Sequence, residues 1–278
     1  MAESELILVT GATGYVGGRL APRLAEAGYR VRCFARDPER LKGRSWRKQV
    51  EVAQGDALNK KSLVDAMQDV SVAYYLIHGV KGGKVNARRD MRAARNFAEA
   101  AEEANVQRII YLGELVNTTD YLSPYLRARH ETGHILRYGR VPVTEFRAGM
   151  IVGSGSILFE MIRYLSEREL LFICPRWFGS MAQPIAIRDV LSYLIDAIKT
   201  PESVGKMIEI GGATRLTYSD MLFAYAKERG LKRFLIRTPF YAPRLSAYWI
   251  HMVTPIHWRL ALPLIDGLRA ELVVHDDL

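Results

Sequence analysis

Three glycines near the start of the chain have the spacing of a phosphate-binding turn. Gly11, Gly14 and Gly17 follow the apolar run Leu6–Val9 and open a segment with helical periodicity. Gly11 lets the chain turn sharply off a strand, Gly14 leaves room for a pyrophosphate at the backbone, and Gly17 lets helix and strand pack closely. The helix N-terminus then offers unpaired N–H groups to the phosphates. The sequence therefore predicts a dinucleotide site here, whose contacts also include Thr13, Tyr15 and Val16.

The residue that follows the second expected strand bears on which dinucleotide is bound. NAD-selective proteins place an acidic residue at the end of that strand, where it holds the ribose hydroxyls. Here the strand ends in Ala35, and Arg36 follows it. Because an arginine can hold a 2′-phosphate with two hydrogen bonds, we expect NADP(H) in preference to NAD. The alternative is a solvated arginine that opens a loop.

Further cofactor contacts are expected after the third and fourth strands. Asp56 is placed to accept a hydrogen bond from the adenine amine, and the alternative is an aspartate that stabilises its own turn. His78 ends the fourth strand at the edge where ligands bind. It either contacts ribose or substrate or is a loop histidine with no role. Ala57 and Leu76 complete the predicted cofactor set.

Strand-like and helix-like segments alternate over the first half of the chain. After the first strand, the expected strands are Arg30–Phe34, Val50–Gln54, Ser71–Ile77, Arg108–Leu112 and Val143–Arg147. The expected helices are Tyr15–Ala27, Lys60–Gln68, Val85–Asn105 and Pro124–Tyr138, with Asn59 and Ser123 as caps of the second and fourth. This alternation predicts an α/β fold with a Rossmann-type doubly wound parallel sheet.

The alternation weakens after Gly149. Helices are expected at Ile157–Glu167, Asp189–Thr200 and Thr217–Gly230, with a short strand at Lys206–Ile210. We therefore expect an NAD(P)-binding Rossmann domain over residues 1–150. A small, partly interleaved C-terminal substrate cap is expected over residues 151–278, with residues 187–210 returning to the sheet.

Composition narrows the class of protein. The 278 residues are 49% hydrophobic and 25% charged, which suits one large α/β domain with a cap. No signal peptide is visible, and no apolar run approaches the ~20 residues of a membrane span. Cys33 and Cys174, the two cysteines, form neither a disulfide framework nor a metal site. We expect a cytoplasmic protein without a metal.

Basic residues cluster just after the second expected strand. The net charge is +9, and six arginines or lysines lie between Arg36 and Lys48. Such a cluster can indicate nucleic acid. Its position beside the phosphate-binding turn favours a phosphorylated nucleotide, and we expect no nucleic-acid partner.

Several motifs resemble the short-chain dehydrogenase/reductase superfamily, in its extended or atypical branch. The glycine turn, Arg36-Asp37-Pro38 and Gly55-Asp56 carry this resemblance. More narrowly, the chain is similar to a group of uncharacterised bacterial NAD(P)-binding proteins. The similar segments are Leu126-Arg127-Ala128-Arg129, residues 141–149, Gly153-Ser154-Gly155-Ser156 and Pro175-Arg176-Trp177. The resemblance implies the fold and the nucleotide but no particular substrate.

The same resemblance implies a catalytic pair on the helix after the fifth strand. Superfamily enzymes carry Tyr-x-x-x-Lys there and a serine at the end of the strand. The matching residues are Tyr125 and Arg129, which share one helical face, and the first helical turn mildly favours a phenolate. The serine position falls near Gly113-Glu114, so Asn117 or Thr118 is the expected substitute. Two alternatives are Glu114 as general base, and a packed tyrosine with Arg129 paired to Glu114 or near Glu131.

The predicted substrate site lies under the cap. An apolar cleft with a few charged groups is the usual small-molecule site. Glu160 and Arg163 can instead pair with each other at i, i+3, and aromatic residues of a cap more often form core. The predicted substrate residues are Phe159, Glu160, Arg163, Trp177 and Gln183.

The tail Pro239–Ile265 mixes aromatic and basic residues, as in Tyr248-Trp249-Ile250-His251. This pattern is typical of a helix at a membrane surface, and equally of a helix packed on the cap or in a dimer contact. The resemblance implies a homodimer through the helices at Val85–Asn105 and Pro124–Tyr138.

The sequence thus favours an NADP(H)-dependent oxidoreductase that acts on a small apolar carbonyl or alcohol. The missing serine and the arginine in place of lysine support an alternative. It is a non-catalytic NADP(H)-binding regulator, sensor or complex-accessory protein. An epimerase- or dehydratase-like enzyme that uses Glu114 is a third hypothesis.

Overall fold

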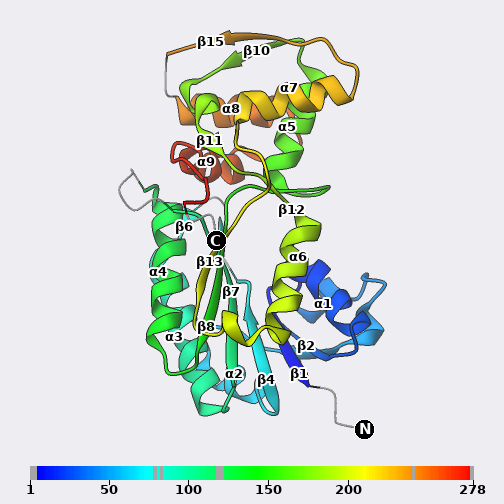
Figure 1. Ribbon diagram of the computed structural model, residues 1–278, viewed down its shortest axis with the longest axis vertical. Coiled ribbons are helices and arrows are strands. Elements are labelled where there is room, and N and C mark those ends of the chain that lie inside the picture. The colour runs from blue at the N-terminus through cyan, green and yellow to red at the C-terminus, as the bar shows by residue number, and fades with distance from the viewer. Residues whose placement is uncertain (1–4, 78–79, 82–83, 117–121, 240–241, 276–278) are drawn as a thin grey trace.

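A seven-stranded parallel sheet forms the centre of the computed structural model (Figure 1). The structure describes residues 5–77, 80–81, 84–116, 122–239 and 242–275. In spatial order the strands are β13 (Met207–Ile210), β8 (Val143–Ala148), β7 (Arg108–Glu114), β4 (Val70–Tyr75), β1 (Leu6–Thr10), β2 (Arg30–Ala35) and β3 (Glu51–Gln54). The chain order reverses between β1 and β4, which confirms the predicted doubly wound sheet.

Helices cover both faces of the sheet, so the central strands are buried on both sides (Figure 1). All five residues of β1 are buried, as expected for a continuous apolar run in a parallel sheet. One face carries α1 (Gly17–Glu26) and α6 (Ile187–Asp196). The other carries α2 (Lys60–Ala66), α3 (Ala87–Glu103) and α4 (Pro124–Tyr138).

Local capping explains where several helices begin. The side chains of Asn59 and Ser123 cap α2 and α4, as predicted. Asn86 caps α3 by accepting a hydrogen bond from the Arg89 N–H, so this helix begins later than expected. The expected helix Asp189–Thr200 begins earlier, at Ile187, and gives way at Ala197 to a short 3-10 turn.

A buried arginine fastens the segment that returns from the cap to the sheet. β13 pairs with β8, and α6 packs on β1 and its neighbours. Arg108 on β7 donates from Nε to Thr144 Oγ1 (3.0 Å) and from Nη2 to Ser203 Oγ (2.6 Å). Its partners are neutral, and burial lowers the pKa of the guanidinium.

The boundary at residue 150 between the two expected domains stays a prediction.

The cap has a core of its own, which includes Phe172, Trp177, Leu222, Ile250 and Ile265. Its helices are α5 (Ile157–Arg168), α7 (Tyr218–Glu228), α8 (Pro243–Val253) and α9 (Trp258–Gly267). Its strands are β9 (Ile151–Val152) with β12 (Ile185–Ala186), β11 (Met181–Ala182) with β14 (Leu216–Thr217), and β10 (Leu171–Cys174) with β15 (Phe234–Arg237).

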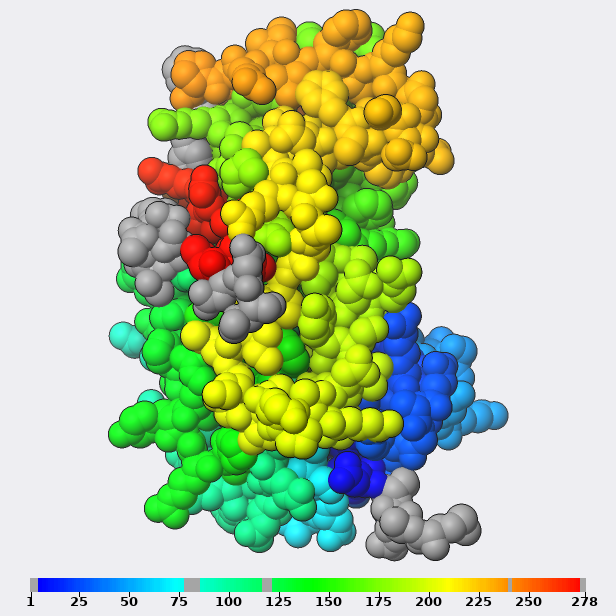
Figure 2. Space-filling view, viewed as in Figure 1, coloured from blue at the N-terminus to red at the C-terminus, as the bar shows by residue number. Residues whose placement is uncertain are grey.

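Two further features complete the fold. β5 (Val80–Lys81) and β6 (Lys84–Val85) form a small antiparallel pair between β4 and α3. Figure 2 shows the N-terminal residues, in blue, toward one end of an elongated molecule and orange residues of the cap at the other. Within the described ranges, no helix is long and apolar enough to cross a membrane.

Candidate functional site

The glycine turn is fixed by close backbone contacts. Gly11 has a φ of +71°, and a Cβ there would lie 2.4 Å from the Leu76 carbonyl oxygen. A Cβ on Gly17 would lie 2.5 Å from the Gly11 carbonyl oxygen. Both positions therefore require glycine, for the turn off β1 and for the approach of α1 to the turn.

The N-terminus of α1 is arranged to receive an anion. The helix has no side-chain cap at Val16 and no acidic residue in its first turn. Two of its first N–H groups already donate within the turn, Gly18 to the Gly14 carbonyl (3.1 Å) and Arg19 to the Val16 carbonyl (3.0 Å), so the N–H groups ahead of Gly18 are those left for a ligand. Thr10 fixes the adjoining edge, because its hydroxyl donates to the Tyr74 carbonyl (2.8 Å) and accepts from the Leu76 N–H (3.1 Å).

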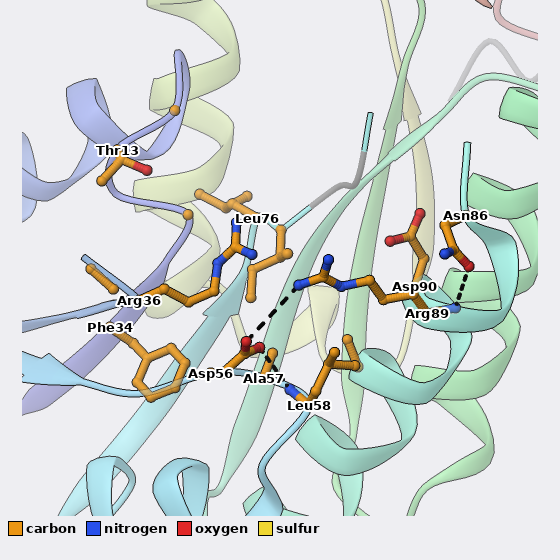
Figure 3. Close-up of a pocket in the computed structure, with 15 residues that line it drawn as sticks. Thr13, Phe34, Arg36, Asp56, Ala57, Leu58, Leu76, Asn86, Arg89 and Asp90 are labelled. Carbon is orange, nitrogen blue, oxygen red and sulfur yellow. Dashed lines mark hydrogen bonds and ion pairs between the residues drawn. The ribbon is translucent and has the colours of Figure 1, made fainter. Parts of the chain in front are cut away.

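A pocket of about 460 Å³ opens at the carboxyl ends of β1, β2 and β4 (Figure 3). Its size suits a small-molecule or cofactor site. Seven of the predicted cofactor residues line it: Gly11, Thr13, Gly14, Arg36, Asp56, Ala57 and Leu76. Tyr15, Val16 and Gly17 stand outside this lining, and His78 lies outside the described residues. The role of each residue in cofactor binding stays a prediction.

Two arginines face the pocket from opposite sides (Figure 3). Arg36 extends into it from the end of β2, and its guanidinium has no hydrogen-bond or ion-pair partner among the residues described. Arg89 reaches in from α3, with Nη2 3.9 Å from Asp56 Oδ2. The other Asp56 oxygen accepts a hydrogen bond from the Leu58 N–H (3.0 Å), which is the turn-stabilising alternative.

Other lining residues were missed by the sequence reasoning. Phe34 forms part of the pocket wall. Its ring packs against Gly55, where an added Cβ would lie 2.5 Å from the ring. Asn86, Arg89 and Asp90 enter from the first turn of α3. Asn86 is a good N-cap residue just after the β4 loop, and that signal could have placed this turn at the ligand edge.

The phosphate-binding turn is tied to the cap. Arg19 on α1 donates from Nη1 to the Tyr15 carbonyl (3.0 Å) and from Nη2 to the Ser154 carbonyl (2.8 Å). The next residue, Gly155, donates its N–H to Glu160 Oε1 on α5 (2.9 Å). A ligand that orders the turn is thereby linked to the first helix of the cap.

A buried polar cluster lies at the carboxyl end of β7. The Tyr125 hydroxyl donates to Glu114 Oε2 (3.3 Å), and Arg129 Nε lies 3.6 Å from the same oxygen. Arg129 Nη2 also donates to the Leu112 carbonyl (2.6 Å). The expected Tyr-x-x-x-Arg pair is therefore bridged by Glu114, the pairing partner that was one of the alternatives.

The protonation state of Tyr125 differs from the expectation. Burial raises the pKa of Tyr125, and the nearby Glu114 carboxylate raises it further. The expected tendency toward a phenolate is thus wrong, because burial and the carboxylate outweigh the helix dipole and Arg129. Burial also raises the pKa of Glu114, opposed by Arg129 and by the Tyr125 hydrogen bond. The substitutes expected for the serine, Asn117 and Thr118, lie outside the described residues.

The cap adds a second phenol close to this cluster. Tyr218 begins α7 and is buried, and its hydroxyl has no hydrogen-bond partner among the described residues. Burial raises its pKa, and the nearby Glu114 carboxylate acts in the same direction. No local signal in the sequence points to this residue, because tertiary packing brings the cap helix near the end of β7.

Each of the predicted substrate residues has a protein partner in the part of the chain that the structure describes. Glu160 and Arg163 form an ion pair (2.7 Å), which is the alternative stated for them. Trp177 is core, with its indole N–H donating to Ser246 Oγ (3.3 Å), and Phe159 contacts the Tyr225 ring edge-on. Gln183 bonds the Gly212 carbonyl (2.7 Å). Their contact with a substrate stays a prediction.

The class of protein follows from comparison with known families. The NAD(P)H-binding family matches residues 11–156, which span the glycine turn, the pocket and the buried polar cluster. The chain belongs to this NAD(P)H-binding family, which confirms the predicted NAD(P)-binding class.

Individual relatives have different roles. The mouse (Mus musculus) mitochondrial NADH dehydrogenase (ubiquinone) 1 alpha subcomplex subunit 9 is 26% identical over 227 residues, 74% of this chain and 56% of that protein. This chain thus spans just over half of that relative. A ceramide reductase of Caulobacter vibrioides is 26% identical, over 84% of this chain and 74% of that protein.

A solved structure shows the same fold. The triphenylmethane reductase of Citrobacter sp., complexed with NADP(H), superposes with a TM-score of 0.76 and 19% identity. The match covers 98% of this chain and 92% of that chain.

Proposed function

We propose that the protein is an NADP(H)-dependent reductase of a small, largely apolar carbonyl substrate. The observation that carries the proposal is the position of the Tyr125–Glu114 pair. This pair lies at the end of β7, the strand next to β4. Arg36 and Asp56 follow β2 and β3, on the other side of the point between β4 and β1 where the strand order reverses. A dinucleotide spans this edge of such a sheet, so its reactive half would approach β7.

The residues of the cluster divide the chemistry among them. Bound NADPH would supply a hydride to the carbonyl carbon of the substrate. Tyr125, kept protonated by burial, would give its proton to the carbonyl oxygen. Glu114, whose protonated form burial favours, would then return its own proton to Tyr125 and take up another from solvent. Arg129 is a positioning residue, since it holds Glu114 and the Leu112 carbonyl.

The preference for NADP(H) over NAD belongs to the same proposal. The Arg36 guanidinium has no partner among the residues that the structure describes, and it stands beside Ala35 in place of an acidic residue. This supports a 2′-phosphate contact. The apolar character of the substrate is supported by the ceramide reductase among the relatives.

A substrate screen tests the catalytic proposal. Aldehydes and ketones of increasing chain length are offered with NADPH, and nucleotide absorbance is followed. With an active substrate, Tyr125→Phe should lower kcat/KM by about 100-fold or more, as loss of a general acid does. Tyr138→Phe, on the same helix but 95% exposed, is the matched control and should keep full activity. Turnover that survives Tyr125→Phe contradicts the mechanism.

A second candidate is a non-catalytic NADP(H)-binding protein that senses the nucleotide or steadies a complex. The observation that favours it is that Arg129 pairs with Glu114 and donates to the Leu112 carbonyl. In superfamily enzymes the lysine at this position binds the nicotinamide ribose, and Arg129 is already bound to protein groups. The mouse relative, named as a subunit of a larger enzyme, supports it. Tight NADPH binding without turnover across the screen would favour this candidate.

Compartment and assembly are part of the proposal. Two free, buried cysteines, Cys33 and Cys174, suit the reducing cytoplasm. We propose a homodimer across α3 and α4, where a groove lies between Arg95, Glu102 and the exposed Tyr138. Light scattering of the full chain tests this assembly.

A further inference from the structure

The two-stranded sheet of the cap has an apolar outer face. β10 and β15 run parallel at the end of the molecule away from β1 (Figure 1). Phe172 and Cys174 are buried beneath this small sheet. The alternate residues point outward, and the register sets Leu171 beside Phe234 and Ile173 beside Ile236. These four side chains are 48%, 61%, 57% and 51% exposed, respectively.

This pattern departs from that of an ordinary surface sheet. An exposed sheet usually alternates apolar residues toward the core with polar residues toward water. Here both sets are apolar, and the outward set is contiguous across the two strands. Contiguous exposed apolar surface of this kind marks an interaction site. The four residues Leu171, Ile173, Phe234 and Ile236 are called the outer face below.

Positive charge surrounds the outer face. The segment Lys227–Arg237, which leads into and forms β15, holds five basic residues and one acidic residue, Glu228. At the far ends of the strands, Arg176 and Arg237 line a pocket of about 310 Å³. No acidic side chain among the described residues pairs with either arginine. Glu167 and Glu169 precede β10, and Glu167 lies 3.8 Å from Arg229, one of the five basic residues.

We propose that the outer face docks on an anionic lipid bilayer. The four apolar side chains would enter the boundary between headgroups and acyl chains, and Arg176 and Arg237 would meet lipid phosphates at the margin. Aliphatic and aromatic side chains suit the acyl chains just below the headgroups, and the long cationic side chains beside them suit the anionic headgroups.

This surface differs from the tail that the sequence singled out. In that tail, Trp249 and Trp258 pack against the cap core, and Tyr248 stacks on Trp258 (5.0 Å between centroids). Leu245, Tyr248 and Met252 remain exposed on α8 at helical spacing. α8 therefore supplies the competing site and the control substitution.

Sedimentation with vesicles tests the proposal on the full chain. Vesicles of phosphatidylcholine are compared with vesicles of phosphatidylcholine and phosphatidylglycerol. We expect binding to the mixed vesicles that weakens with added salt. The double variant Ile173→Ser/Ile236→Ser removes one facing pair of the outer face and should weaken binding about tenfold or more. Arg176→Gln/Arg237→Gln should weaken binding to the mixed vesicles by about tenfold or more.

The control is Met252→Ser on α8, a residue that is 78% exposed and lies outside the outer face. It should bind vesicles like the unsubstituted chain, and NADPH binding by every variant checks that each is folded. Failure of the unsubstituted chain to bind the mixed vesicles overturns the proposal, as does unchanged binding by the isoleucine double variant. Loss of binding on Met252→Ser assigns the contact to the tail instead. If the unsubstituted chain binds no vesicles but forms a dimer that the isoleucine double variant abolishes, the outer face is a contact between two copies of the chain and the proposal is overturned.

Discussion

The Tyr125 hydroxyl donates a hydrogen bond to Glu114 Oε2 (3.3 Å), and this bond joins the first turn of α4 to the end of β7. Both groups are buried, and burial raises the pKa of each. A carboxyl group with a raised pKa thus lies next to a phenol whose pKa is also raised, so burial favours the neutral form of both groups. Such a pair can move a proton without leaving a charge exposed to water.

The raised pKa of Glu114 predicts a pH-dependent stability. An acid whose pKa is higher in the folded than in the unfolded state costs stability once it ionises. The cost is absent well below the ordinary value of 4.5 and grows as pH rises through the folded pKa. In Glu114→Gln this contribution is removed. The unfolding free energy of the unsubstituted chain minus that of the variant should therefore fall as pH rises above 4.5.

The magnitude should be about 1.4 kcal/mol for each tenfold change in proton affinity. Urea unfolding at a series of pH values measures the difference, and Asp189→Asn, an exposed carboxylate paired with Arg188, is the control. A difference that stays flat or rises with pH would show that the ion pair with Arg129 outweighs burial.

Arg36 should decide between the two nucleotides. Its guanidinium has no partner among the described residues around the pocket, and a hydrogen bond to a charged group contributes about 1.5–3 kcal/mol. Arg36→Ala should therefore weaken NADPH binding by about 10- to 100-fold and leave NADH binding nearly unchanged. Calorimetric titration with both nucleotides measures this. Arg40→Ala, from the same basic cluster but outside the pocket lining, should change neither affinity; an equal loss there would point to a general electrostatic field.

Gly17 should tolerate no side chain, although it lies in a helix. An exposed glycine in a helix gains up to about 1 kcal/mol when it becomes alanine. At Gly17 the added Cβ would stand 2.5 Å from a backbone oxygen of the phosphate turn. Gly17→Ala should therefore lower the unfolding free energy by about 1–3 kcal/mol and weaken NADPH binding. Gly43→Ala, with no heavy atom within 4 Å of the added carbon, should be neutral in thermal unfolding.

The parts that sequence predicted share a local cause. β1 is identified by a run of apolar residues because both of its faces are buried, and the glycine spacing follows from contacts among neighbouring residues. Asn59 and Ser123 act on the helix turn that follows them. Such signals lie within a few residues of their effect, so the sheet, most helices and the phosphate turn could be predicted.

The parts that sequence missed arise from contacts between distant segments. Nothing near Tyr218 in the sequence indicates that Glu114 raises its pKa, because packing of the cap on the sheet brings the two groups near each other. Trp177 was expected in an apolar cleft under the cap, but its indole N–H donates to Ser246 in the cap core. Arg89 was missed because its helix was expected to begin before Asn86.

Arg108 should hold the returning segment on the sheet. Its guanidinium bonds Thr144, Ser203 and the Ala197 carbonyl, and these buried acceptors lose their donor in Arg108→Met. Each unsatisfied buried group costs about 1–3 kcal/mol, partly offset because a buried charge is removed. We expect a net loss of about 2–4 kcal/mol in urea unfolding, with faster proteolysis between α6 and β13. Arg188→Met removes an exposed ion pair and should stay within about 0.5 kcal/mol. If Arg108→Met unfolds like the unsubstituted chain, the packing of α6 on the sheet, and not the arginine, retains the segment.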